Sequence, residues 1–160
     1  MDFRLEFTPK PFTVPIKHQD KLLLIGSCFT ENIGTKLKNH KWDLIENPNG
    51  ILFNPVSIVQ SMESYINLQK YTDKDLFYHN ECWHSWQHHS RFSHPDQNEA
   101  LKGINTSQQS AHEFLQTADW VLITLGSSFV YTYQEQGYVA NCHKIPTDKF
   151  NKVLLGADEI

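Results

Sequence analysis

Cysteine is scarce in this chain, and its three thiols are far apart in the sequence: Cys28, Cys82 and Cys142. Three scattered cysteines cannot form the disulfide framework of a small secreted domain, so we expect free thiols. No stretch approaches the roughly 20 apolar residues of a membrane span, and residues 1–12 contain no apolar signal core. These absences favour a soluble, cytoplasmic protein, with a signal removed earlier as the alternative.

Positive charge is also in short supply. The chain has 14 Lys and Arg against 18 Asp and Glu, which gives a net charge of −4, and it contains no long basic run. Neither nucleic acid nor a membrane surface is therefore an expected partner. What is present suits one packed domain: 160 residues, of which 39% are hydrophobic and 12% aromatic.

The most informative stretch runs from Lys21 to Lys38. The short apolar run 22–25 predicts a buried strand, and an amphipathic helical pattern follows directly after Gly26, Ser27 and Cys28. Ligands of open α/β sheets bind at the carboxyl ends of strands, and helix N-termini offer free amides that can hold an oxyanion. Ser27 is therefore a candidate nucleophile. The alternative is a serine that only caps the helix.

Other patterns outline the rest of the fold. We expect Phe29, Ile33 and Leu37 to form the buried face of the first helix, and Thr106 to open a third helix through a capping box. The remaining predicted elements are a short strand at 42–46, a helix capped by Asn54 with Pro55 at its first position, a buried strand at 120–125, a hairpin of 129–133 with 138–141, and the first turn of a helix at 153–160.

Residues 70–104 are rich in histidine and aromatic residues and show no clear period, which we interpret as a hairpin-like insertion. Zinc is one hypothesis for the segment, since it takes His and Cys ligands. The candidates are His79, Cys82, His84, His88, His89 and His94. Their spacing fits no structural zinc pattern, so we expect no metal and favour a lobe beside the active site. Arg91 of this lobe would bind an anionic substrate group or pair with a surface carboxylate.

The sequence resembles the GSCFA family, named for its Gly-Ser-Cys-Phe-Ala motif. The motif reads GSCFT at 26–30, and further matches follow in family order at 47–55 (NPNGILFNP), 124–131 (TLGSSFVY) and 140–146 (ANCHKIP). The family is similar to the SGNH hydrolases, a group of esterases and lipases. The resemblance implies a three-layer α/β/α, flavodoxin-like fold with a parallel sheet, in which 22–25 and 120–125 are central strands.

The resemblance also implies roles for individual residues. Ser27 would be the nucleophile, and the backbone amides of Cys28 and Gly50 would stabilise the oxyanion, helped by Gly126 or Ser128. Ser128 stands where the SGNH pattern has an asparagine, and this departure leaves the usual third donor in doubt. Two further candidates for substrate binding follow a later β-like run: Asn141, which would supply the missing amide, and His143.

The general base is not apparent. SGNH enzymes carry a histidine near the C-terminus with an aspartate three residues before it, and this chain has no such pair. Because family members are about twice this length, we expect the N-terminal part of a hydrolase, with His143 or another internal histidine as the alternative base. The expected function is ester hydrolysis, as an esterase or deacetylase without a cofactor, on a small-molecule or carbohydrate ester. The competing hypothesis is a non-catalytic, His-rich binding module.

Overall fold

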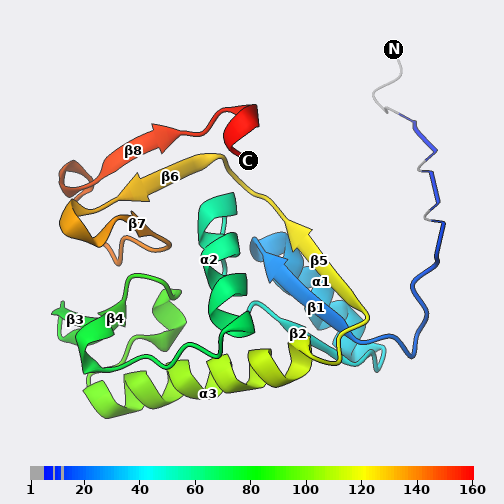
Figure 1. Ribbon diagram of the computed structural model, residues 1–160, viewed down its shortest axis with the longest axis horizontal. Helices are drawn as coiled ribbons and strands as arrows, with labels where there is room; N and C mark the ends of the chain where they lie inside the picture. The colour runs from blue at the N-terminus through cyan, green and yellow to red at the C-terminus, as the bar shows by residue number, and fades with distance from the viewer. Residues whose placement is uncertain (1–5, 9, 12) are drawn as a thin grey trace.

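The computed structural model describes residues 6–8, 10–11 and 13–160 of the chain (Figure 1). The elements in chain order are β1 (Leu22–Gly26), α1 (Cys28–Asn39), β2 (Leu44–Glu46), α2 (Pro55–Ile66), β3 (Leu76–His79), β4 (Cys82–Ser85), α3 (Gln97–Leu115), β5 (Trp120–Thr124), β6 (Phe129–Thr132), β7 (Tyr138–Val139) and β8 (Asn151–Leu154). Among the described residues, no helix combines the length and the apolar character needed to cross a bilayer.

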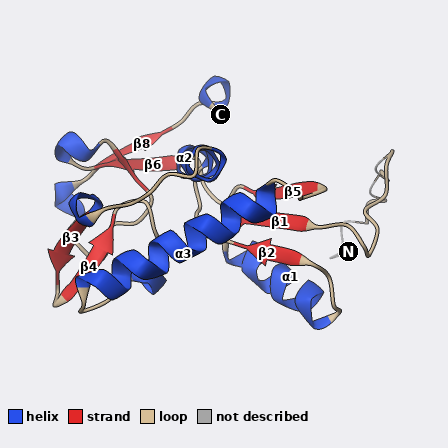
Figure 2. Ribbon diagram, turned by 60° about the horizontal axis from the view of Figure 1, so that its bottom comes forward, coloured by secondary structure: helices blue, strands red, loops and turns tan. Residues whose placement is uncertain are grey.

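A three-stranded parallel sheet in the order β2-β1-β5 organises one part of the fold. Leu22 and Leu24 of β1 pack with Leu37 of α1, whereas Leu23 and Ile25 point to the other face and pack against α2 and α3. Figure 2 shows α1 below the strands and α2 above them. The prediction of an α/β fold with a parallel sheet is therefore confirmed.

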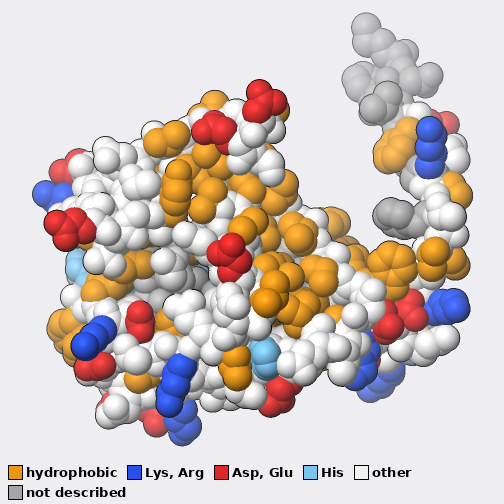
Figure 3. Space-filling model, in the orientation of Figure 1, with side chains coloured by type: hydrophobic (Ala, Val, Ile, Leu, Met, Phe, Trp, Pro, Cys, Tyr) orange, Lys and Arg blue, Asp and Glu red, His pale blue; other side chains and the backbone are white. Residues whose placement is uncertain are grey.

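Strand β5 corrects one expectation, because it lies at the edge of this sheet and not at its centre. The side chains of Val121, Ile123 and the following Leu125 are 40%, 50% and 54% exposed. Leu23 and Ile25 of the neighbouring strand are fully buried, so α2 and α3 cover β1 and leave β5 open on the same face. Figure 3 shows apolar side chains gathered around the position of β5. An apolar run thus predicted the strand correctly but not its burial.

The first two helices follow their sequence signals in part. Asn54 caps α2 by accepting a hydrogen bond from the Ser57 amide at 2.8 Å, and Pro55 occupies the first turn as predicted. In α1 the buried residues are Thr30 and Gly34, whereas Phe29 is 61% exposed, contrary to expectation. A Cβ atom on Gly34 would collide with the Glu46 carboxylate, so the glycine allows α1 to lie close against β2.

The third helix starts much earlier than the sequence suggested. It begins at Gln97, with Asp96 as its cap, and not near Thr106. Its buried positions are Ala100, Ile104, Gln108 and Ala111. Two alanines and a glutamine make a weak apolar signal at helical spacing, which explains why the pattern was missed. The predicted insertion 70–104 therefore contains the β3–β4 hairpin and also the first turns of α3.

The hairpin packs against a second antiparallel sheet in the order β7-β6-β8, and we call these two sheets the β lobe. The predicted hairpin of β6 and β7 is confirmed. The predicted helical turn at 153–160 is wrong at its start, because residues 151–154 pair with β6, with Leu154 opposite Phe129, and a single 3-10 turn forms only at Ala157–Glu159. The core of the lobe is formed by Trp86, Val139 and Phe150, and the Phe77 ring stacks on Trp86 with centroids 3.9 Å apart.

Candidate active site

The turn between β1 and α1 is held on both sides by its neighbours. Asn47 Oδ1 accepts a hydrogen bond from the Gly26 amide at 2.8 Å, and the Gly26 carbonyl accepts one from the Leu52 amide at 2.9 Å. Gly26 has a positive φ of 146°, and a Cβ atom there would collide with the Thr124 carbonyl oxygen. Only glycine fits this position, so the turn that presents Ser27 is fixed by β5 and by the loop after β2.

Ser27 is half-buried and caps α1, and its hydroxyl oxygen accepts a hydrogen bond from the Phe29 amide at 3.3 Å. Thr124 Oγ1 lies 3.4 Å from Ser27 Oγ and accepts from the Ser27 amide at 3.2 Å. The Thr124 hydroxyl also bonds to that of Thr30. The role of Thr124 was not predicted from the sequence. It is the last residue of β5 and pairs with Gly26 of β1, and this place at the end of a predicted strand is the signal that could have indicated it.

The predicted oxyanion donors differ in how far they are free. The Gly50 amide donates to the Asn47 carbonyl at 2.7 Å, and the Gly126 amide donates to the Phe53 carbonyl at 2.9 Å. The Cys28 amide stands at the first helical position, where no carbonyl four residues earlier belongs to the helix. Of the three amides, that of Cys28 alone therefore has both the helix position and the freedom to donate to a ligand.

Gly126, two residues after the end of β5, also lies beside Ser27. A Cβ atom on Gly126 would lie 3.4 Å from Ser27 Cβ and 3.1 Å from the ring of Phe53. In the order β2-β1-β5, the chain leaves β1 toward β2 on one side and returns as β5 on the other. Such a reversal opens a crevice at the carboxyl ends of the strands, where ligands of α/β folds bind. Ser27 and Gly126 both follow strands of this sheet at their carboxyl ends.

A cavity of about 470 Å³ lies near the carboxyl end of β5, and its wall includes Phe53, His89, Ser127, Asn141 and Lys152. It thus contains Asn141, one of the predicted residues, whose side-chain oxygen accepts from the His143 amide at 2.8 Å. Ser27 does not line the cavity. Gly126 lies next to both Ser27 and the ring of Phe53, and Phe53 forms part of the cavity wall. The Ser27 hydroxyl and the cavity are therefore neighbours and do not form one continuous pocket.

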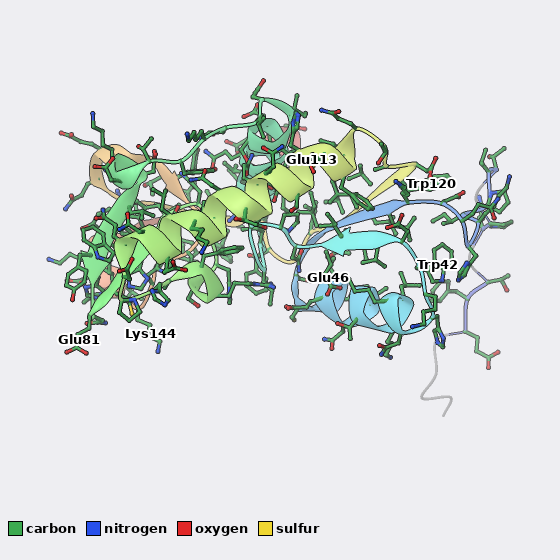
Figure 4. All side chains as sticks on the ribbon, turned by 90° about the horizontal axis from the view of Figure 1, so that it is seen from below. Trp42, Glu46, Glu81, Glu113, Trp120 and Lys144 are labelled. Carbon is green, nitrogen blue, oxygen red and sulfur yellow. The ribbon has the colours of Figure 1, made fainter. Side chains whose placement is uncertain are left out.

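His143 and Ser128 make their hydrogen bonds within the β lobe. The His143 ring is buried in the β lobe, its Nε2 atom bonds to the Ser85 carbonyl at 2.7 Å, and burial lowers its pKa to about 4. Figure 4 shows the next residue, Lys144, at the end of the molecule opposite Trp120. The Ser128 carbonyl accepts from the Leu155 amide at 3.0 Å, which ties this residue to the strand pairing of β6 and β8.

The His-rich segment fills the β lobe and also reaches α1. His84 uses both ring nitrogens, toward Ser93 Oγ at 2.6 Å and the His79 carbonyl at 2.9 Å. Within the described residues, no three His, Cys, Asp or Glu side chains are grouped so that they could hold a metal ion. Arg91 pairs with Glu31 of α1 at 3.3 Å, which is the surface-carboxylate alternative predicted for it.

His89 is the histidine that lines the cavity beside the crevice. Its Cβ atom covers Gly50, and its pKa is lowered by burial and by the nearby positive charge of Arg91. The ring is therefore mostly neutral near pH 7, which is the form that accepts a proton.

Comparisons with known proteins give one result. A comparison of the chain with curated proteins finds no match, and a comparison with solved structures also finds none. The model of the GSCFA family matches residues 21–160, from the start of β1 onward, and the chain therefore belongs to the GSCFA family.

Proposed function

We propose that this protein is a serine hydrolase, an esterase or deacetylase, whose nucleophile is Ser27. One observation carries the proposal: Ser27 Oγ stands at the carboxyl end of a parallel strand and at the N-terminus of α1, 3.4 Å from Thr124 Oγ1. A helix N-terminus stabilises negative charge that develops beside it. The sheet order β2-β1-β5 supports a relation to the flavodoxin-like fold of SGNH hydrolases, which begins with the order 2-1-3.

In the proposed reaction Ser27 Oγ attacks the ester carbonyl carbon and forms a carbon–oxygen bond, while its proton passes to a general base. The Cys28 amide donates to the resulting oxyanion. Collapse of the tetrahedral intermediate breaks the bond to the alcohol, which leaves with a proton and forms the acyl-enzyme. Water then releases the acid and restores the Ser27 hydroxyl. Thr124 is a positioning residue here, because its hydroxyl bonds to both the Ser27 amide and Thr30.

The proton acceptor of this scheme is the histidine, oriented by an aspartate, that the resemblance to SGNH hydrolases implies. In the described part of the chain, the hydroxyl of Ser27 contacts Thr124 and the Phe29 amide and no histidine ring. The proposal therefore rests on the position of Ser27 at the strand end and helix start, and not on a base seen beside it. His89 is the internal alternative, because it lines the neighbouring cavity. His143 is less suitable, because its ring is committed to Ser85 within the β lobe. By analogy with the wider SGNH group, the substrate is an ester of a carbohydrate.

One group of observations favours a second candidate function, a non-catalytic binding module that retains the fold. The amides of Gly50 and Gly126 are both occupied by carbonyls, and the Ser27 hydroxyl already serves as a helix cap. A serine without an adjacent base is a weak nucleophile at neutral pH. In this alternative Ser27 only caps α1, and neither the natural protein nor residues 1–160 hydrolyse an ester.

Covalent labelling by a fluorophosphonate, read as intact mass, distinguishes the two functions. It should be applied to the protein from its natural source and to residues 1–160 alone. The Ser27→Asn variant retains a cap but no nucleophile, and Ser110→Ala is a control on the exposed face of α3. We expect one adduct on the natural protein that is lost in Ser27→Asn and kept in the control. If the natural protein is not labelled, the proposed hydrolase function is refuted. If residues 1–160, tested by themselves, are also labelled, the general base lies inside this chain.

A further inference from the structure

The cavity of about 470 Å³ near the carboxyl end of β5 combines aromatic rings with one lysine. Phe53, Phe129 and Tyr131 supply the rings, and the side chains of Phe53 and Phe129 are 48% and 39% exposed. Ligand pockets of this size are usually mostly apolar, with a few polar groups that fix the orientation of the ligand. The wall therefore has the composition of a site for a molecule with an apolar body.

Lys152 of β8 is the lysine of this wall, and its ammonium group lies directly against the lining rings. Nζ is 3.8 Å from the centre of the Phe129 ring and 5.9 Å from that of Tyr131. Such contacts attract a cation but leave its charge unneutralised. Among the described residues, no Asp or Glu lines the cavity, and none of the ion pairs includes Lys152. The cavity thus contains a positive charge that no carboxylate of the wall balances.

Two asparagines of the same wall add hydrogen-bond donors. The side-chain oxygen of Asn54 accepts from the Ser57 amide, and that of Asn141 accepts from the His143 amide, both at 2.8 Å. The NH2 group of each asparagine has no hydrogen-bond partner among the described residues, and neither nitrogen is closed off from solvent. An amide NH2 group only donates hydrogen bonds. The free side-chain groups of both asparagines are therefore donors, like the ammonium of Lys152.

The chemistry of these groups selects the ligand. Because an ammonium and an amide NH2 group only donate, the ligand must supply acceptor oxygens. Hydrogen bonds between charged partners are roughly twice as strong as those between neutral ones, so a lysine without a carboxylate partner favours an anion. The wall has one lysine and no arginine, which matches the single charge of a carboxylate better than the double charge of a phosphate.

We propose that this cavity binds a carboxylate carried on an apolar body, with Lys152 at the carboxylate and the rings of Phe53 and Phe129 against the body. The proposal does not depend on catalysis by Ser27, which does not line the cavity. Removal of the Lys152 charge should weaken binding of the acid and leave binding of the uncharged amide of the same shape unchanged.

Isothermal titration calorimetry on the full chain tests the proposal, with benzoate, phenylacetate and hexanoate as probes and the uncharged amide of each acid as its comparator. We expect at least one acid to bind more tightly than its amide. Lys152→Met, which keeps the length of the side chain, should lower the affinity for that acid about tenfold, and Lys152→Arg should keep the preference for the acid. Lys149→Met removes the same charge outside the cavity wall and should bind like the wild type.

A second variant tests the site from the opposite side of the charge balance. Asn141→Asp keeps the shape of the side chain and the oxygen that accepts from the His143 amide, but it replaces the NH2 donor by a negative charge. Its affinity for the acid should also fall at least tenfold. Ser27→Asn should bind the acid like the wild type, so the outcome is independent of the proposed hydrolase function.

Three results would overturn the proposal: none of the three acids binds, no acid binds more tightly than its amide, or Lys152→Met keeps the wild-type affinity for the acid. An equal loss of acid binding in Lys149→Met would also overturn it, because the effect would then come from the net charge of the protein and not from the cavity. Unchanged binding of the amide in Lys152→Met shows that the variant is folded.

Discussion

Acidification should destabilise this protein through two buried histidines, His88 and His143. The His88 ring is 1% exposed, its Nδ1 atom lies 2.8 Å from Ser85 Oγ, and burial lowers its pKa from 6.5 to about 3. Burial likewise lowers the pKa of His143 to about 4. Tyr71 and Phe92 pack edge-on to the His88 ring, so its neighbours supply no negative charge that would stabilise a proton there.

The sign of the effect follows from the direction of the two shifts. Both folded pKa values lie below the unfolded value of 6.5, so the unfolded chain takes up protons first as the pH falls. The stability that these rings retain above pH 6.5 is therefore lost on acidification. Each pH unit costs ~1.4 kcal/mol per ring, so at pH 5 the free energy of unfolding should be lower by about 2 kcal/mol for each ring and about 4 kcal/mol for both.

Urea unfolding followed by tryptophan fluorescence, at pH 8 and pH 5, measures this loss. In His88→Gln the pH-dependent loss should shrink by about 2 kcal/mol, because one of the two titrating rings is gone. Ser110→Ala, on the exposed face of α3, provides a control that removes no titrating group, and its loss of stability between pH 8 and pH 5 should equal that of the wild type. If wild type and His88→Gln lost the same stability between pH 8 and pH 5, the His88 ring would not be buried in its neutral form, and the reasoning would fail.

Two further predictions concern the parallel sheet. Gly26→Ala should lower the free energy of unfolding by about 2–4 kcal/mol in a urea titration, because the backbone has a positive φ and Cβ meets the Thr124 carbonyl; Gly103→Ala, where the nearest atom would be 3.9 Å away, should not destabilise the protein. Ile123→Lys should reduce concentration-dependent association in light scattering with little change in stability, since Ile123 is half-exposed on an edge strand. A wild type that stays monomeric at all concentrations would contradict the second prediction.

The features predicted correctly from the sequence are those that adjacent residues determine. The apolar run 22–25 needs only its own composition to form β1, and Asn54 with Pro55 starts α2 through a hydrogen bond three residues along the chain. The position of Ser27 at a strand–helix turn is local in the same sense. These interactions span a few residues, so the pattern alone contains the information.

The features that were missed depend on residues far apart in the sequence. Thr124 reaches Ser27 because β5 pairs with β1 across 97 residues of chain. The Gly126 amide is occupied because the Phe53 carbonyl lies opposite it, which no local pattern of glycines indicates. The edge position of β5 and the pairing of β8 with β6 likewise follow from which helices and strands are adjacent in space.

Ser27 and Ser57 show why a serine at a helix start cannot be assigned from its position alone. Both lie in the first turn region of a helix, yet Ser27 Oγ accepts the Phe29 amide as a cap, whereas Ser57 Oγ is buried with no partner. Loss of a cap costs about 0.5–2 kcal/mol, so part of any effect of Ser27→Ala would be structural. Loss of an unpaired hydroxyl carries no such penalty. A polar group that lowers stability is therefore a better indication of function than a position at a helix start. At Ser27, a catalytic role of the hydroxyl can be measured only in a variant that preserves the cap.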